Sequence, residues 1–440
     1  MFEKNADSKK LGLWTSTSLV VGNMIGAGVF LMPAALASYG SISLLGWVLA
    51  SIGTFFLAKV FGNLSKLLPG ITGGPYAYTR SGLGDFAGFL VAWGYWLSTA
   101  CANAAITISL VSALSTFFPV LSANAVIAVI TGLTAIALLS WINTRGVVVS
   151  GKLQLITTGL KLLPLFLIAI GGLFLIRGSN FHPFNNTGGS FWSALNTTAA
   201  FTMFAFVGIE CASIPAGNVA EPEKTIPKAT NLGLLISTLV YVLGSVSIIG
   251  VLPNNQLMHS VTPYADAAQL IYGPSARYWV SAGIAIAAFG ALNGWILIQG
   301  QVPYAIAKDK MFPAVFGWEN KRKVPYMGIV INGIVVSLLM LMNYSKGLVD
   351  QFRFLLQLAV FTIFIPYLFS TIAYIVIRLR HGNKAGSLHS AVILFVLAFV
   401  YSLWAIAGAG EKSVYYGFIL LFASMPFYVW VNYKKQSDVK

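Results

Sequence analysis

Two ionisable residues inside long apolar segments are the strongest candidates for chemistry in this sequence. Of the 12 acidic residues, all but Glu210 lie in polar connections or near the ends of apolar segments. Lys161 lies at the centre of another apolar segment. A charge at the centre of a bilayer costs at least about 2.5 kcal/mol, so a residue that carries one there is expected to be functional. A carboxyl group and an amine at such depth point to proton transfer or to binding of a charged ligand.

Each deep charge also allows a structural interpretation. Glu210 could brace an interrupted helix as a hydrogen-bonded carboxyl group. The Lys161 ammonium could donate to backbone carbonyls in place of a bound cation, or it could lose its proton and take part in proton coupling. The residues themselves leave these alternatives open, and both interpretations of Lys161 disfavour a sodium-driven mechanism.

Glycine and proline interrupt two apolar segments in the same pattern. Gly26 and Gly28 precede Pro33 in one segment, and Gly208 precedes Pro215 in the other with the spacing that separates Gly26 from Pro33. In a helix interior glycine costs about 1 kcal/mol and proline about 3 kcal/mol, so matched interruptions need a reason. Close helix packing would explain one such segment. A matched pair favours unwound backbone around a cavity, where free N–H and C=O groups bind both ends of an amino acid.

Polar and aromatic side chains at mid-segment depth are further candidates for ligand contact. Asn103 lies about two turns after Tyr95 in one segment, and Trp295 lies in a later one. Aromatic residues in such segments more often pack or lie at membrane interfaces. Zinc, Walker and paired-carboxylate motifs are missing from the sequence, and Cys101 and Cys211 both lie in apolar segments. We therefore expect no enzyme, no metal site and no cofactor.

A scaffold embedded in lipid must position these residues. Of the 440 residues, 57% are hydrophobic and 9% are charged, whereas a soluble chain carries about 25% charged residues. A soluble fold is excluded. A spanning helix needs about 20 mainly apolar residues, and twelve segments meet this requirement: 12–37, 42–66, 84–115, 123–142, 152–176, 194–216, 228–252, 276–302, 324–343, 351–378, 387–408 and 412–433.

The basic residues orient these spans. A formal charge of +15 would suit nucleic acid only if the basic residues formed one patch, and they are spread over the connections instead. With the N-terminus inside, 20 of the 27 Lys and Arg residues lie on the inner side and five on the outer side. This bias follows the positive-inside rule. We predict that both termini are cytoplasmic and that nucleic acid is no partner.

The matched breaks also predict an internal repeat. Pro164 and Pro366 hold corresponding places in the fifth and tenth spans, which indicates five spans repeated as five. The polar connections are too short to fold independently, so we expect one membrane domain over residues 1–440. Its expected parts are a first repeat at 12–176, a second at 194–378 and two peripheral helices at 387–433.

Several motifs along the chain are shared with a known family. They are Gly22-Asn23, Gly26-Ala27-Gly28-Val29-Phe30 and Pro33 in span 1, Gly73-Gly74-Pro75-Tyr76-Ala77-Tyr78 after span 2, Phe206-Val207-Gly208-Ile209-Glu210 in span 6, Gly294-Trp295 in span 8 and Pro366-Tyr367 in span 10. Together they resemble the amino acid–polyamine–organocation (APC) transporters, and within them the bacterial arginine/agmatine antiporter subfamily. The resemblance covers about residues 11–433.

The resemblance implies a fold and a binding site. The fold is an all-α membrane protein with twelve transmembrane helices, a five-plus-five inverted repeat of the leucine-transporter type and broken helices 1 and 6. The substrate carboxylate would meet the N–H groups around Ala27 and Gly28, beside Asn23, and the α-amino group would meet carbonyls near Val207. Further substrate contacts are implied for Asn103, Phe204, Trp295 and Ala359, and gating or proton coupling for Tyr95, Glu210 and Lys161.

The expected function is therefore amino-acid antiport by alternating access in a bacterial inner membrane. A basic amino acid, arginine above all, would be exchanged for a related amino acid or its decarboxylated amine. Phe204 stands where the arginine antiporter has tryptophan, and Lys161 resembles the lysine of proton-coupled members, so a proton-coupled carrier of neutral amino acids is the alternative. A non-transporting membrane sensor is a third. The sequence leaves the oligomeric state open, with a homodimer among the alternatives.

Overall fold

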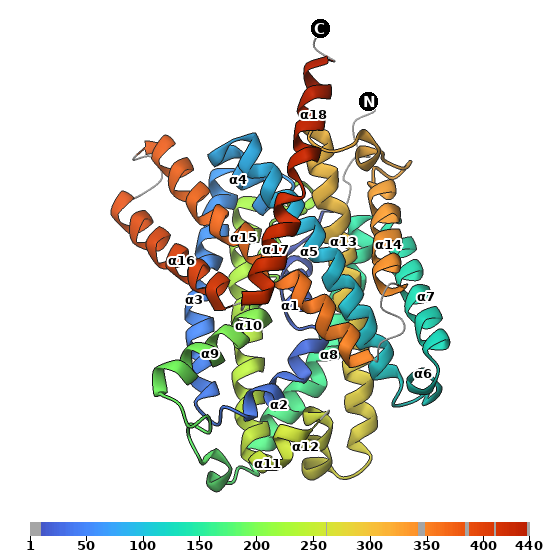
Figure 1. The fold of residues 1–440 in the computed structure, drawn as a ribbon, viewed down its shortest axis with the longest axis vertical. Coiled ribbons are helices and arrows are strands. Elements are labelled where there is room, and N and C mark those ends of the chain that lie inside the picture. Colours follow the sequence, from blue (N-terminus) through green and yellow to red (C-terminus); the bar gives the residue numbers. More distant parts are fainter. Residues whose placement is uncertain (1–9, 261, 342–347, 383–386, 409–410, 438–440) are drawn as a thin grey trace, which may run out of the picture.

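The computed structural model of the chain is a bundle of helices that run between two ends of the molecule (Figure 1). The structure describes residues 10–260, 262–341, 348–382, 387–408 and 411–437. Within these residues, nine helices are long and apolar enough to cross a membrane, and α14 (Tyr326–Leu341) is apolar but shorter. The remaining two predicted spans, the first and the sixth, are each divided into shorter pieces. The expected all-α architecture with twelve spans is therefore confirmed.

The long helices match the predicted spans to within a few residues, apart from α10, which begins earlier at Pro222, and α13, which continues to Lys308. Eight of the nine are α3 (Ser43–Leu67), α5 (Asp85–Leu114), α7 (Ala125–Asn143), α8 (Val147–Leu173), α10 (Pro222–Val251), α13 (Ala276–Lys308), α15 (Leu348–Arg380) and α16 (Leu388–Gly408). The ninth apolar segment, Val414–Val431, covers parts of the last two helices.

The first span is interrupted where the glycines predicted it. It consists of α1 (Leu13–Met24), the 3-10 helix η1 (Ala27–Phe30) and α2 (Met32–Ala37). Gly26 is extended between the first two pieces, with φ −94° and ψ −175°. Pro33 lies at the start of α2, where its missing N–H costs no helical hydrogen bond.

The sixth span is interrupted more severely. It begins with α9 (Phe191–Met203) and the 3-10 helix η3 (Phe204–Phe206). Residues 207–215 then form turns rather than α-helix, before the short 3-10 helix η4 (Ala216–Asn218). Gly208 has φ +110°, a conformation that side-chain-bearing residues rarely adopt.

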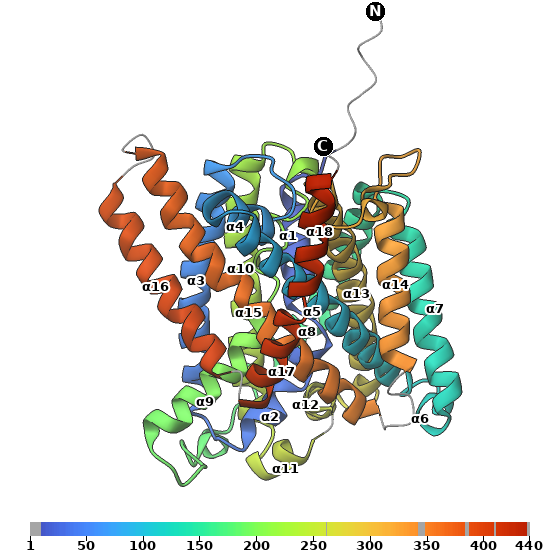
Figure 2. The same ribbon diagram turned by 45° about the horizontal axis from the view of Figure 1, so that its top comes forward.

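The shorter elements fall into two groups at opposite ends of the bundle. Figures 1 and 2 show α4 (Pro75–Leu83) and α18 (Met425–Ser437) at one end, and α2, α11 (Asn254–His259) and α12 (Pro263–Tyr272) at the other. The first end is the one predicted to be inside, and α6 (Val120–Ala123) lies toward the second. The helices therefore alternate in direction as the twelve-span prediction requires.

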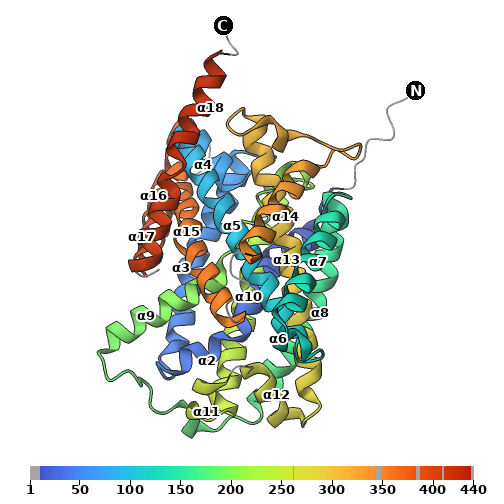
Figure 3. The ribbon, with the colours of Figure 1, turned by 45° about the vertical axis from the view of Figure 1, so that its right-hand side comes forward.

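Two segments differ from the sequence prediction. The connection between the seventh and eighth predicted spans, residues 253–275, contains α12. This helix buries Tyr264, whose ring lies 5.1 Å from that of Phe30. A search for 20-residue apolar runs cannot detect so short a helix. The last predicted span is divided into α17 (Glu411–Phe422) and α18, because Pro426 at the start of α18 disfavours continuation of the preceding helix. Figure 3 shows α16, α17 and α18 along one flank.

Candidate functional site

The two interruptions lie against each other. A Cβ atom on Gly208 would lie 3.2 Å from both the Asn23 Cβ and the Met24 nitrogen, so the turn in span 6 contacts the end of α1. A Cβ on Gly28 would meet no atom within 4 Å. The first N–H groups of a helix have no intrahelical partner, and Gly26 offers η1 no side-chain cap. Backbone donors at the start of η1 therefore border open space.

Lys161 satisfies the carbonyl groups at the end of α1. The side chain is 0% exposed, and Nζ donates to the Gly22 carbonyl at 2.7 Å and to the Ile25 carbonyl at 2.6 Å. These carbonyls belong to the last turn of α1, where helical carbonyls lose their partners. An ammonium here also complements the negative end of the helix dipole. The geometry matches the first alternative for Lys161, donation to backbone carbonyls in place of a cation.

Glu210 is held by two tyrosines. Tyr95 on α5 donates to Glu210 Oε1 and Tyr367 on α15 donates to Oε2, each at 2.5 Å. Tyr367 also accepts a hydrogen bond from the Gly208 N–H at 3.1 Å. All three side chains are almost completely buried. The carboxyl group thus links spans 3, 6 and 10 beside the break in span 6.

The family resemblance implied gating or proton coupling for Tyr95, Glu210 and Lys161, and it implied no role for Tyr367. The structure brings Tyr95, Glu210 and Tyr367 together. Tyr367 stood in the Pro366-Tyr367 motif, and a mid-span tyrosine beside the only deep acidic residue would have been a usable signal. The pairing itself depends on how span 10 packs against span 6.

The predicted aromatic residues lie around the interruptions. The Trp295 ring centroid is 6.5 Å from that of Tyr95, and its Nε1 donates to the Asn23 carbonyl at 3.3 Å. Phe204, the first residue of η3, is partly exposed and packs edge-on against Phe364 with centroids 5.4 Å apart. Trp295 therefore lies at the end of α1, and Phe204 lies just before the break in span 6.

Asn103 lies in an amide pair that the sequence did not predict. It is 0% exposed, and its Nδ2 donates to Gln299 Oε1 on α13 at 2.6 Å. Asn103 Oδ1 and Gln299 Nε2 have no hydrogen-bond partner among the described residues. The backbone carbonyl of Gln299 accepts a hydrogen bond from the Asn332 side chain on α14 at 2.5 Å. The sequence offered a signal for Gln299, because an amide side chain within an apolar segment is a candidate for the same reason as Asn103.

The remaining predicted contacts are backbone positions or lie outside the described side chains. Val207 ends η3 with extended backbone, φ −63° and ψ 130°, which turns its carbonyl out of helical alignment. Ala27 is the first residue of η1, and Ala359 lies within α15. The side chains of Ala27 and Ala359 are outside the described part of the structure.

Polar contacts close the end of the bundle that holds α4. Arg80 on α4 pairs with Asp85 at the start of α5 and with Asp309 at the end of α13, both at 2.8 Å. Tyr76 donates to Asp309 at 2.7 Å, and burial together with this hydrogen bond raises the pKa of the Tyr76 hydroxyl above its usual range. These contacts join the connection after span 2 to the end of span 8.

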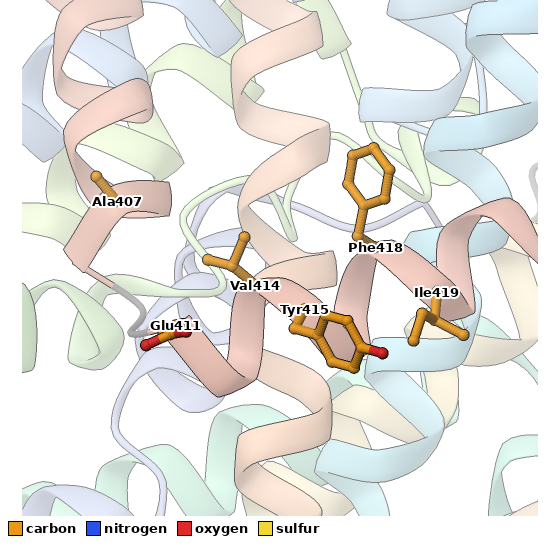
Figure 4. A pocket seen from close by; sticks show the side chains of 6 residues that line it. All are labelled: Ala407, Glu411, Val414, Tyr415, Phe418 and Ile419. Carbon is orange, nitrogen blue, oxygen red and sulfur yellow. The ribbon is translucent and has the colours of Figure 1, made fainter.

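An apolar cavity of about 560 Å³ lies away from these residues (Figure 4). Its lining comes from α16 and α17 and consists of Ala407, Glu411, Val414, Tyr415, Phe418 and Ile419. A groove between peripheral apolar helices faces lipid in a membrane protein. No candidate site residue contributes to it.

Comparisons with known proteins identify relatives of this chain. The family model described as amino acid permease matches residues 11–433. A protein of Bacillus subtilis strain 168, provisionally named an arginine/ornithine antiporter, is 32% identical over 98% of this chain and 99% of its own. The arginine/agmatine antiporter of Chlamydia pneumoniae is 30% identical over 99% of this chain and 93% of its own.

A solved structure shares the fold. It is the substrate-bound, outward-open state of a Na⁺-coupled sialic acid symporter, with a TM-score of 0.55 and 12% identity over 91% of this chain and 88% of that one. At this identity the likeness concerns architecture alone, which is the leucine-transporter type. The two interrupted spans and the family match over nearly the whole length lead to one conclusion: the chain belongs to the amino acid permease family of the APC superfamily.

Proposed function

We propose that the protein is a secondary active antiporter that exchanges a basic amino acid, arginine first, for a related amino acid or its decarboxylated amine. The observation that carries the proposal is the contact between two interrupted spans, in a family of permeases whose relatives bear antiporter names. Interrupted helices at mid-membrane offer backbone donors and acceptors to a zwitterion. The protein works without a catalytic step, in a bacterial inner membrane with both termini cytoplasmic.

In this proposal the substrate lies between spans 1, 3, 6, 8 and 10. The N–H groups at Ala27 and Gly28 and the amide of Asn23 bind the carboxylate, while the carbonyl of Val207 binds the α-amino group. Partners are also proposed for the substrate side chain. They are the rings of Phe204 and Trp295, which suit a cation–π contact, with Asn103 and Ala359 nearby.

The buried carboxyl cluster supplies the proposed inner gate. Tyr95 and Tyr367 tie Glu210 to two other spans, so the path past the break in span 6 is closed in this conformation. Opening toward the cytoplasm requires these hydrogen bonds to be exchanged for water. Lys161 donates hydrogen bonds to the carbonyl groups at the end of α1, where a sodium ion would otherwise bind. Because no sodium ion is needed there, we favour exchange driven by the substrates themselves.

Transport into proteoliposomes tests the proposal. Vesicles that contain unlabelled arginine, ornithine or agmatine should take up radiolabelled arginine, while empty vesicles should not. Uptake into empty vesicles that follows an imposed pH gradient would instead establish a proton-coupled symporter. No uptake of any of the twenty amino acids or common polyamines, with binding retained, would establish a sensor.

A further inference from the structure

Four buried amides form a chain from the long helices to the interruption in span 1. Asn143 on α7 donates through Nδ2 to Asn293 Oδ1 at 3.1 Å. Asn293 on α13 donates through Nδ2 to Gln154 Oε1 at 3.2 Å, and Gln154 on α8 donates through Nε2 to Asn23 Oδ1 on α1 at 3.5 Å. None of the four side chains is more than 4% exposed. All donors therefore point along the chain toward Asn23.

Backbone carbonyls fix which atom is the nitrogen in the amides of Asn293 and Gln154. Asn293 Nδ2 also contacts the Ser150 carbonyl at 3.0 Å, and Gln154 Nε2 contacts the Ser18 carbonyl at 3.4 Å. A carbonyl oxygen only accepts hydrogen bonds, so a flipped amide would place two acceptors against each other. The direction of the chain is therefore determined by the main chain.

Asn23, at the end of the chain, has a free donor. Its Oδ1 accepts from Gln154, whereas its Nδ2 is buried without a hydrogen-bond partner among the described residues. The Cys211 thiol interacts with this amide from span 6, but sulfur is a weak acceptor. Because Gly208 lies beside Asn23, the free N–H is at the junction of the two interrupted spans. A buried donor without an acceptor is costly, and a ligand oxygen would relieve that cost.

Two glycines make room for the last contact of the chain. A Cβ on Gly22 would lie 1.8 Å from Gln154 Nε2, and a Cβ on Gly294 would lie 2.0 Å from Asn23 Oδ1. A side chain at either position would push these amides aside. The packing of α1 and α13 is thus built around the contact between Gln154 and Asn23.

We propose that Gln154 is a positioning residue for substrate binding, which holds the Asn23 amide with its N–H toward the α-carboxylate of a bound amino acid. The inference rests on the proposed function. A carboxylate is a strong acceptor, and hydrogen bonds to a charged oxygen are stronger than those between neutral groups. Gln154 itself does not touch the substrate. Because a decarboxylated amine has no such oxygen, Gln154 contributes to the affinity for the amino acid and not for the amine.

The test compares substrates with and without a carboxylate in proteoliposomes loaded with arginine. Gln154→Met removes the donor at nearly constant length, and Gln154→Glu keeps an acceptor for Asn293 but places a carboxyl oxygen against Asn23. Either variant should raise the KM for arginine about fivefold, the size expected for one hydrogen bond. The inhibition constants of agmatine and of argininamide, and kcat for arginine, should change less than about twofold.

A second variant and a matched control complete the experiment. Asn23→Ala should raise the KM for arginine by at least as much, and Gln154→Met should have no further effect in that background. The control is Gln301→Met, which removes another buried amide of α13. It should leave the KM for arginine and the inhibition constant of agmatine unchanged. If Gln154→Met does not fold, Gln154→Glu and Asn23→Ala provide the same comparison.

Two results would overturn the proposal. One is an equal loss of affinity for arginine and agmatine in the Gln154 variants, and the other is additivity with Asn23→Ala. Wild-type protein that exchanges no substrate would refute the proposed function instead. In that case thermal-shift titrations with arginine and agmatine still decide whether Gln154 acts through a carboxylate.

Discussion

Removal of the Tyr367 hydroxyl should loosen the inner side of the site. This hydroxyl donates to Glu210 at 2.5 Å and accepts from the Gly208 N–H at 3.1 Å, and both contacts are buried. In Tyr367→Phe the carboxyl group keeps one tyrosine partner and the N–H loses its own. The main loss is the unpaired N–H, because a buried polar group without a partner costs about 1–3 kcal/mol. The closed arrangement should therefore lose about 1–3 kcal/mol relative to an open, hydrated one.

The native thiol of Cys211 reports this opening. It follows Glu210 directly and is 0% exposed, so a maleimide should reach it only when the cluster opens. With about 1.4 kcal/mol for each factor of ten, the rate of modification should rise about 5- to 150-fold in Tyr367→Phe. The measurement uses mass spectrometry of a Cys101→Ser background, in which Cys211 is the remaining cysteine of the chain.

The control is another buried tyrosine hydroxyl. Tyr401 contacts the Ala50 carbonyl at 3.0 Å and Thr54 Oγ1 at 2.9 Å, between spans 2 and 11. Tyr401→Phe removes a comparable number of hydrogen bonds without touching the cluster. A modification rate that stays at the wild-type value in Tyr367→Phe, or rises equally in Tyr401→Phe, would refute the assignment of the tyrosine–glutamate cluster as an inner gate.

Three further predictions concern single positions. Lys161→Met should lower the thermal unfolding temperature in detergent, because two backbone carbonyls at the end of α1 lose a charged donor; an unchanged temperature would show that other groups satisfy them. Gly294→Ala should reduce exchange at least tenfold with the protein still folded, since its Cβ would lie 2.0 Å from Asn23 Oδ1; normal exchange would refute the tight contact. Glu319 accepts a hydrogen bond from Tyr304, which lowers the pKa of its carboxyl group. The contribution of this contact to the stability of the fold is therefore present above the unfolded-state pKa and is lost as the pH falls through the folded-state pKa. Glu319→Gln should flatten that acid-side loss in thermal melts between about pH 5 and pH 3, and an unaltered profile would contradict it.

Local sequence was sufficient for the spans and their interruptions. Lipid demands about 20 apolar residues for each crossing helix, and this constraint can be evaluated one segment at a time. Gly26 and Gly208 marked the breaks because glycine and proline oppose helix within a few residues of where they occur. Short elements such as α12 were missed, because ten residues with one buried face give no spanning signal. The division of the last span followed Pro426, a local cause that a window of apolar residues ignores.

The candidate site was only partly predictable for a different reason. Glu210 and Lys161 were identified because a buried charge is costly wherever the chain folds. Their partners come from segments more than a hundred residues away: Gly22 and Ile25 for Lys161, and Tyr95 and Tyr367 for Glu210. Hydrogen-bond partners at such separation depend on helix packing, which no local pattern encodes.

The sequence by itself determined that this chain is an all-helical membrane protein with two matched interruptions, a deep carboxyl group and a deep amine. These features follow from the solvation of each segment in lipid, so composition and spacing suffice. Only the tertiary structure decided that the interruptions touch at Asn23 and Gly208, and that Gln154 reaches Asn23 through room left by glycines. Such contacts arise from shape complementarity between helices, and a missing Cβ has meaning only when its neighbour is known.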